Sequence, residues 1–74
     1  EVWEEYTGVQ EIMSMALEKL PPVQKTVILL RDYEAYSYGE IAGITGLNES
    51  QVKVYIFRAR AFMKAYIRRP DLVI

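Results

Sequence analysis

SYGEIAGITGLNESQVKVYIFRARAFM, residues 37–63, contains two helix-start signatures eleven positions apart. Ser37 is followed three residues later by Glu40, and Asn48 is followed three residues later by Gln51. In each pair the first side chain can accept a hydrogen bond from a free N–H of the first turn, and the second can reach back to the N–H of the cap residue. The stretch therefore predicts two helices that begin close together in the chain.

A glycine lies between these two predicted helices. Gly46 can adopt the backbone conformations that end a helix and turn it sharply. A short helix, a tight turn and a longer helix that runs from about Glu49 to Arg68 form a helix-turn-helix pattern. We predict this motif over about residues 37–68, and we expect Pro70 to end its second helix.

The chain before this motif predicts two further helices. Apolar residues recur at spacings of three, four and seven over about residues 2–19, which is typical of an amphipathic helix; they are Trp3, Tyr6, Met13, Ala16, Leu17 and Leu20. Pro21 and Pro22 stop that helix, and Pro22 fits the first turn of a second one that ends near residues 32–34. The predicted fold is all-α, with four helices in a single domain over residues 1–74.

The third and fourth helices have apolar residues that we expect to face the core. In the third helix these are Ile41, Ala42 and Ile44, at least in part. In the fourth helix, at 100° per residue, a narrow sector is apolar; it contains Val52, Ile56, Ala59 and Met63. Gly43 interrupts the third helix and marks either a close-packing point or a weak position.

Composition narrows the class of protein. The chain has 51% hydrophobic and 26% charged residues, as globular domains do, and it has neither Cys nor His. The usual zinc, thiolate and imidazole sites are therefore excluded, and we expect no metal, cofactor or enzymatic activity. No apolar run approaches the roughly 20 residues of a membrane span, and no signal peptide is visible, so we expect a cytoplasmic protein. Because the sequence does not begin with Met, we expect it to be part of a longer chain.

Charge is distributed unevenly, although the net charge is −1. Residues 1–20 carry five acidic side chains and one Lys, whereas residues 47–69 carry six basic side chains and one Glu. Screening limits the reach of each charge to about 8–10 Å, so a local basic stripe matters more than the sum. The alternatives for this stripe are a solvated face and a nucleic-acid-binding face.

The outer face of the fourth helix favours duplex DNA. Phe57 and Val54 occupy positions where a solvated helix would carry charged residues, and thymine methyl groups in the major groove suit such side chains. Arg58 suits a guanine edge, and short polar residues stand where a recognition helix enters the groove. We predict base contacts for six residues: Ser50, Gln51, Lys53, Val54, Phe57 and Arg58.

Five other residues are predicted to contact phosphates. Free N–H groups at the start of the third helix can hold a phosphate, with Ser37 and Tyr38 beside them. Arg31, Arg60 and Lys64 supply the cations. The alternatives are a core-edge role for Tyr38 and a helix-end role for Arg31.

Four short motifs together resemble the fourth region of bacterial sigma factors of the extracytoplasmic-function group. They are LEKLP at 17–21, SYGEIA at 37–42, QVK at 51–53 and FRAR at 57–60, and the resemblance covers about residues 14–66. It implies a domain that reads the −35 promoter element and grips the flap of RNA polymerase, on surfaces that an anti-sigma factor could also cover. The positions of the six predicted base readers then face the major groove, and those of Arg31 and Tyr38 lie near phosphates.

The chain departs from that family at one place and lacks one of its regions. Val54 and Tyr55 stand where a small residue followed by Arg is common, which removes the expected cation at position 55 and affects base preference. The region that melts DNA in the family is missing, so we expect this chain alone not to open a promoter.

Two other functions remain open at this point. A domain that serves chiefly as a protein-interaction module would use the acidic first helix and an apolar groove between the first two helices. A DNA-binding domain of a LuxR-like response regulator shares the four-helix plan, but the proline pair and the Arg-Ala-Arg ending argue against it.

Overall fold

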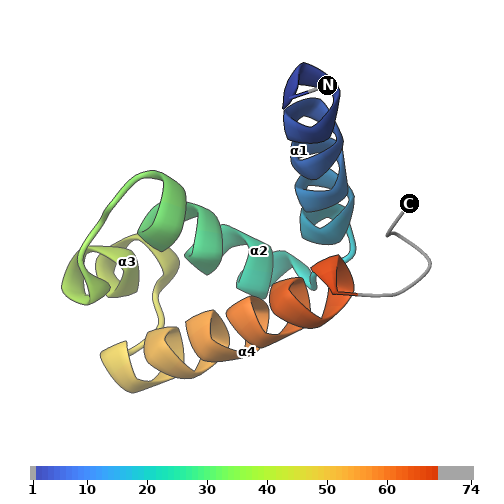
Figure 1. Ribbon diagram of the computed structural model, residues 1–74. Helices are drawn as coiled ribbons and strands as arrows, with labels where there is room; N and C mark the ends of the chain where they lie inside the picture. Colours follow the sequence, from blue (N-terminus) through green and yellow to red (C-terminus); the bar gives the residue numbers. More distant parts are fainter. Residues whose placement is uncertain (1, 69–74) are drawn as a thin grey trace.

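The computed structural model describes the backbone of residues 2–68 and the side chains of residues 8–68. This part of the chain forms four α-helices and one π-helical turn, arranged as in Figure 1; their bounds are α1 Val2–Glu18, α2 Pro22–Ile28, η1 Leu29–Tyr33, α3 Tyr38–Thr45 and α4 Glu49–Ile67. The predicted all-α fold with four helices is confirmed. The predicted helix stop at Pro70 and the side chains of Trp3 and Tyr6 lie outside the described residues.

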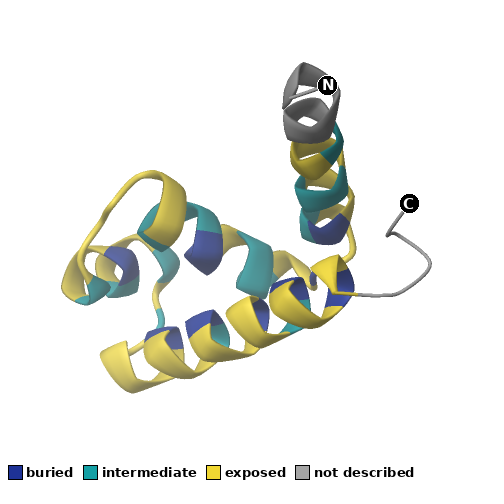
Figure 2. Cartoon of the chain, in the orientation of Figure 1, coloured by how far each residue is buried: buried dark blue, intermediate teal, exposed yellow. Residues whose placement is uncertain are grey.

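Helix α4 is the element against which the others pack. Helix α2 runs above it, α3 lies beside its beginning, and α1 stands steeply over its end (Figure 1). The buried residues of α4 form a line on the side that faces these helices, and the opposite side is exposed along its whole length (Figure 2). None of the described helices is both long and apolar enough to cross a membrane.

The first of two hydrophobic clusters holds the helix-turn-helix together. Val27, Ile41, Val52 and Ile56 are at most 2% exposed and join α2, α3 and α4. Leu47, in the turn, packs against the same cluster. The relative placement of α3 and α4 therefore depends on four buried aliphatic side chains.

The second cluster attaches α1 to the end of α4. It consists of six buried residues from α1, the loop that follows it, α2 and α4: Ala16, Leu20, Ile28, Ala59, Met63 and Tyr66. The apolar sector predicted for α4 is confirmed, since all four of its predicted members are buried.

Both capping boxes form as predicted. Glu40 N–H donates to Ser37 Oγ at 3.0 Å, and Ser37 N–H donates to Glu40 Oε1 at 2.8 Å. Gln51 N–H donates to Asn48 Oδ1 at 2.8 Å, and Asn48 N–H donates to Gln51 Oε1 at 3.0 Å. Gly46 ends α3 with a φ of 79°, a left-handed conformation that favours glycine. These local interactions fix where both helices of the motif begin and where the first one ends.

The second predicted helix does not continue regularly to residues 32–34. The α-helix ends at Ile28, and Leu29–Tyr33 is a π-helix whose last turn is closed by a bond from Glu34 N–H to the Leu29 carbonyl. Ala35 then adopts a φ of 61°, which is uncommon for a residue other than glycine. The wider π-helical turn changes the direction of the side chains at its end. A search for apolar residues that recur every 3.6 positions does not detect such a turn.

Ile44 was predicted to face inward at least in part, and this prediction is wrong. Its side chain is 57% exposed, whereas Ile41 is fully buried and Ala42 is half-buried. The side of α3 that packs contains Tyr38, Ile41, Ala42 and Thr45, which are buried or half-buried. At 100° per residue Ile44 lies about 60° from Ile41 on the side away from the other three, so its side chain points to solvent.

Gly43 is a weak position rather than a close-packing point. A Cβ atom added there would meet nothing within 4 Å, and its φ lies outside the left-handed region. Gly43→Ala should therefore raise the free energy of unfolding by about 0.5–1 kcal/mol, because alanine loses less backbone entropy in a helix. Urea unfolding followed by circular dichroism measures this. Gly46→Ala is the matched control and should destabilise the chain, because alanine is strained at a positive φ; a destabilised Gly43→Ala chain would contradict the assignment.

Candidate nucleic-acid interface

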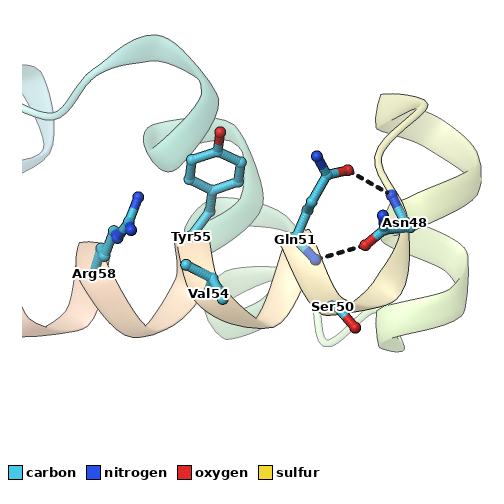
Figure 3. Close-up of a pocket in the computed structure, with 6 residues that line it drawn as sticks. All are labelled: Asn48, Ser50, Gln51, Val54, Tyr55 and Arg58. Atoms are coloured by element: carbon cyan, nitrogen blue, oxygen red, sulfur yellow. Dashed lines mark hydrogen bonds between the residues drawn. The ribbon is translucent and has the colours of Figure 1, made fainter.

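The exposed face of α4 begins at its N-terminus and combines polar, apolar and basic groups. Phe57 is 73% exposed and Val54 is 45% exposed, as predicted, and Ser50 and Arg58 are also exposed. Part of this face is a surface hollow of about 240 Å³ that runs along the first half of α4 (Figure 3); its lining residues are Asn48, Ser50, Gln51, Val54, Tyr55 and Arg58. The hollow brings together four of the six residues predicted to contact bases.

Gln51 has two roles in this face. Its Oε1 accepts from the N–H of Asn48 and so completes the cap of α4, as Figure 3 shows. The amide nitrogen of the same side chain has two donors, and the structure records no partner for it among the described residues. Gln51 can therefore cap the helix and still donate to an acceptor outside the protein.

Tyr38 gathers two cations at the start of α3. The guanidinium carbon of Arg31 lies 4.4 Å from the centre of the Tyr38 ring, and Lys53 Nζ lies 5.3 Å from it. Arg31 also donates through Nη1 to the carbonyl of Tyr36 at 2.8 Å, which holds the loop after η1. The structure therefore brings Lys53, predicted to contact a base, next to two residues predicted to contact phosphates.

Arg60, a predicted phosphate contact, already binds a carboxylate. Its Nε donates to Asp32 Oδ2 at 2.9 Å, and its second contact joins Nη2 to Asp32 Oδ1. The hydrogen bond from Arg60 is the main reason why the pKa of Asp32 lies below its ordinary value, and the same bond raises the pKa of Arg60. Sequence reasoning missed Asp32, since 28 residues separate the partners and nothing local indicates the pair.

The other two predicted phosphate contacts differ in their surroundings. Lys64 is exposed on α4, and no ion pair is recorded for it in the part of the chain that the structure describes. The Ser37 side chain is used as the cap of α3, so only its position at the helix start remains as an argument for a phosphate contact. Both contacts stay predictions.

Residues 10–63 match the family described as Sigma-70, region 4. The chain belongs to the sigma-70 region 4 family. It is also 42% identical over 57 residues to the RNA polymerase sigma factor SigV of Bacillus subtilis (strain 168). That alignment covers 77% of this chain and 34% of the relative, so the chain spans about a third of the length of this curated relative. No solved structure gives a significant match.

Membership of the sigma-70 region 4 family confirms the resemblance that the sequence motifs predicted. The matched residues include the helix-turn-helix up to Met63 and the end of α1. They also include all the residues predicted to contact bases. The alternative of a response-regulator domain is not supported, because the matched family is a sigma-factor region.

Proposed function

We propose that this region 4 domain binds the −35 element of promoters in the major groove, as part of RNA polymerase holoenzyme, and so directs transcription initiation. The observation that carries the proposal is the exposed face of α4. Phe57, 73% exposed, stands between Val54 and Arg58 on the second helix of a helix-turn-helix. A large aromatic side chain that is mostly exposed among polar and basic groups supports a role in binding a partner.

The chemistry of this face fits base edges. Apolar contacts with thymine methyl groups suit Phe57 and Val54, and a bidentate contact with guanine suits Arg58. Ser50 and Gln51 lie at the N-terminal end of α4, which is the end that a recognition helix inserts into the groove. The mixed character of the face therefore supports sequence-dependent binding rather than charge attraction alone.

The cations beside this face fit the phosphate backbone. Arg31 and Lys53 each lie over the ring of Tyr38 at the first turn of α3, the end of a helix where the first backbone N–H groups have no partner within the helix. Phosphate contacts at that point and base contacts along α4 are the two sets that a helix-turn-helix uses. Lys53 could join either set of contacts, because it is one of the predicted base contacts and also lies over the Tyr38 ring at the start of α3.

A salt titration of the chain against a fluorescent duplex tests the proposal. Contacts with phosphates release counterions, so the logarithm of the affinity should fall linearly with the logarithm of the salt concentration, by about 0.9 per phosphate neutralised. Affinity should also rise when the duplex carries the preferred promoter sequence. Binding that is absent at low salt for every duplex, both to the chain alone and to polymerase holoenzyme that contains it, would contradict the proposal.

Lys64→Ala should weaken binding to all duplexes by the same factor and should reduce the salt slope by about one. Its side chain is exposed on α4 and is not among the residues that line the hollow at the beginning of the helix. Fluorescence anisotropy with a promoter duplex and a mixed-sequence duplex measures both effects. Lys19→Ala, an identical change in the turn that follows α1, is the control and should leave the slope unchanged. A loss limited to one sequence would contradict a phosphate contact for Lys64.

A second candidate function is supported by an apolar groove that borders the ion pair between Asp32 and Arg60. The groove has a volume of about 340 Å³ and lies between α1, the end of α2, η1 and α4; its lining residues are Met13, Ile28, Asp32, Tyr33, Arg60, Met63 and Ile67. The partly exposed Tyr33 and Ile67 suit an apolar partner helix such as the polymerase flap, and an anti-sigma factor could cover the same groove. A pull-down with the flap helix tests this, and Tyr33→Ala should reduce capture without changing DNA binding.

A further inference from the structure

The ion pair between Asp32 and Arg60 connects η1 to the basic flank of α4. It is bidentate, with both nitrogens of the guanidinium fork used, which is the strongest geometry available to such a pair. The two side chains are 32% and 49% exposed, so the pair lies at the surface and not in the core. The carboxylate of Asp32 thus occupies the donors of the Arg60 guanidinium that could otherwise bind two oxygens of a DNA phosphate.

Arg60 lies within a group of cations on one side of the domain. Lys53, Arg60 and Lys64 follow each other at intervals of seven and four residues, which places them on the same side of α4. Arg31 precedes Asp32 directly, and Arg31 and Lys53 both lie over the Tyr38 ring. We call Arg31, Lys53, Arg60 and Lys64 the basic flank.

Within this flank the cations have different partners. Among the described residues, ion pairs are recorded only between Lys25 and Glu18 and between Arg60 and Asp32. No ion pair is recorded for Arg31, Lys53 or Lys64 within the described part of the chain, whereas the charge of Arg60 is neutralised by a residue from η1.

On the basis of the proposed DNA-binding function, we infer that Asp32 limits the affinity of the domain for DNA of any sequence by binding Arg60 in place of a phosphate. Asp32 withholds one phosphate contact that the position of Arg60 would otherwise supply. The affinity for DNA then depends more on the exposed face of α4, which contains the predicted base contacts, and on the partners of the domain.

Competition between two anions explains why Asp32 is effective. A phosphate that approaches Arg60 must displace a carboxylate that is already in place, so the exchange gains little. The same phosphate meeting an unpaired arginine would release a counterion and gain affinity. Asp32 belongs to the π-helical turn that follows α2, and from there its carboxylate reaches Arg60 of α4.

The test is the affinity of the Asp32→Asn variant for a mixed-sequence duplex of about 20 base pairs. It is measured by fluorescence anisotropy at salt concentrations from about 50 to about 200 mM. Asparagine keeps the shape of the side chain and removes its charge. The expected result is a salt slope steeper by about 0.9 and an affinity higher by about 8-fold at 0.1 M salt, which corresponds to one additional phosphate contact. An unchanged or weaker affinity of the folded variant would overturn the inference.

Glu34→Gln is the matched control for charge. Glu34 is exposed at the end of η1, two residues from Asp32, and its side chain has no recorded partner among the described residues. Its removal changes the net charge equally but frees no cation, so its effect should be much smaller than that of Asp32→Asn. Equal gains from the two variants would show a general charge effect and would overturn the inference.

A double variant and a measurement on the unmodified chain complete the test. In a background of Arg60→Gln, Asp32→Asn should gain no more affinity for DNA than Glu34→Gln does; an undiminished gain of about 8-fold would overturn the inference.

In the unmodified chain, the Nε–H resonance of Arg60 should keep both its chemical shift and its slow exchange with solvent when DNA is added. Loss of that protection would mean that phosphate takes Arg60 from Asp32. If the unmodified chain and its holoenzyme bind no DNA at all, the proposed function itself fails, which is a different outcome.

Discussion

Ile56→Ala should leave most of the 74-residue chain unfolded at 37 °C. Ile56 is 2% exposed and packs with Val27, Ile41 and Val52 in the cluster that joins three helices. Truncating a buried isoleucine to alanine costs about 2–5 kcal/mol, and a domain of this size has only a few kcal/mol of stability to lose. Urea unfolding followed by circular dichroism measures the loss.

Ile44→Ala is the matched control for this prediction. It makes the same chemical change on α3, but its side chain is 57% exposed, so the effect should stay within about 0.5 kcal/mol. Equal unfolding midpoints for the two variants would contradict the arrangement of the core. At temperatures where Ile56→Ala is unfolded, DNA binding should disappear with the fold, because α3 and α4 no longer hold the phosphate and base contacts in one geometry.

Arg58→Ala should weaken binding to the preferred promoter duplex by about 1–3 kcal/mol, which corresponds to roughly 5–150-fold. Arg58 is exposed on α4 and lines the hollow that contains Ser50, Gln51 and Val54. Loss of a bidentate contact with one base should also relax the preference at that base pair only. Titration of the chain with the preferred duplex and with its single-base variants measures both effects.

Arg68→Ala provides the comparison, because Arg68 is an exposed arginine at the opposite end of α4. It should change affinity for all duplexes slightly and equally. If Arg58→Ala behaves in the same way, Arg58 contacts the DNA backbone and its assignment as a base contact is wrong.

The parts of the fold that depend on local interactions were predictable from the sequence. The two capping boxes and the left-handed Gly46 involve residues at most four positions apart, and each forms as its residue types predict. The apolar sector of α4 follows from helical periodicity over 19 residues, which is long enough to average out single exceptions.

The parts that depend on tertiary contacts were not predictable in this way. Ile44 looks like a core residue by type, but the contacts with α2 and α4 are made by the side of α3 that contains Tyr38, Ile41 and Ala42, and Ile44 lies beyond its edge. The π-helical turn at Leu29–Tyr33, which contains Asp32, leaves no mark in hydrophobic periodicity, and neither does the contact between Asp32 and Arg60.

The sequence predicted which side chains of the candidate site are exposed, but not which of them contact one another. The exposure of Phe57, Val54 and Arg58 follows from their position opposite the apolar sector. The cluster of Arg31 and Lys53 on Tyr38 required the structure, because it joins η1, α3 and α4. Charge counting along α4 could not distinguish a cation that is neutralised by a distant residue from one that is unpaired.

The most direct test of the proposed interface is a nitrogen–proton NMR titration of the 74-residue chain with a promoter duplex. The largest shifts should fall on the first half of α4, from Ser50 to Arg58, and on the first turn of α3 at Tyr38. The amides of Met13, Tyr33 and Ile67, beside the apolar groove, should change little. Shifts concentrated at that groove, with the first half of α4 unaffected, would contradict the assignment of α4 as the DNA-binding helix.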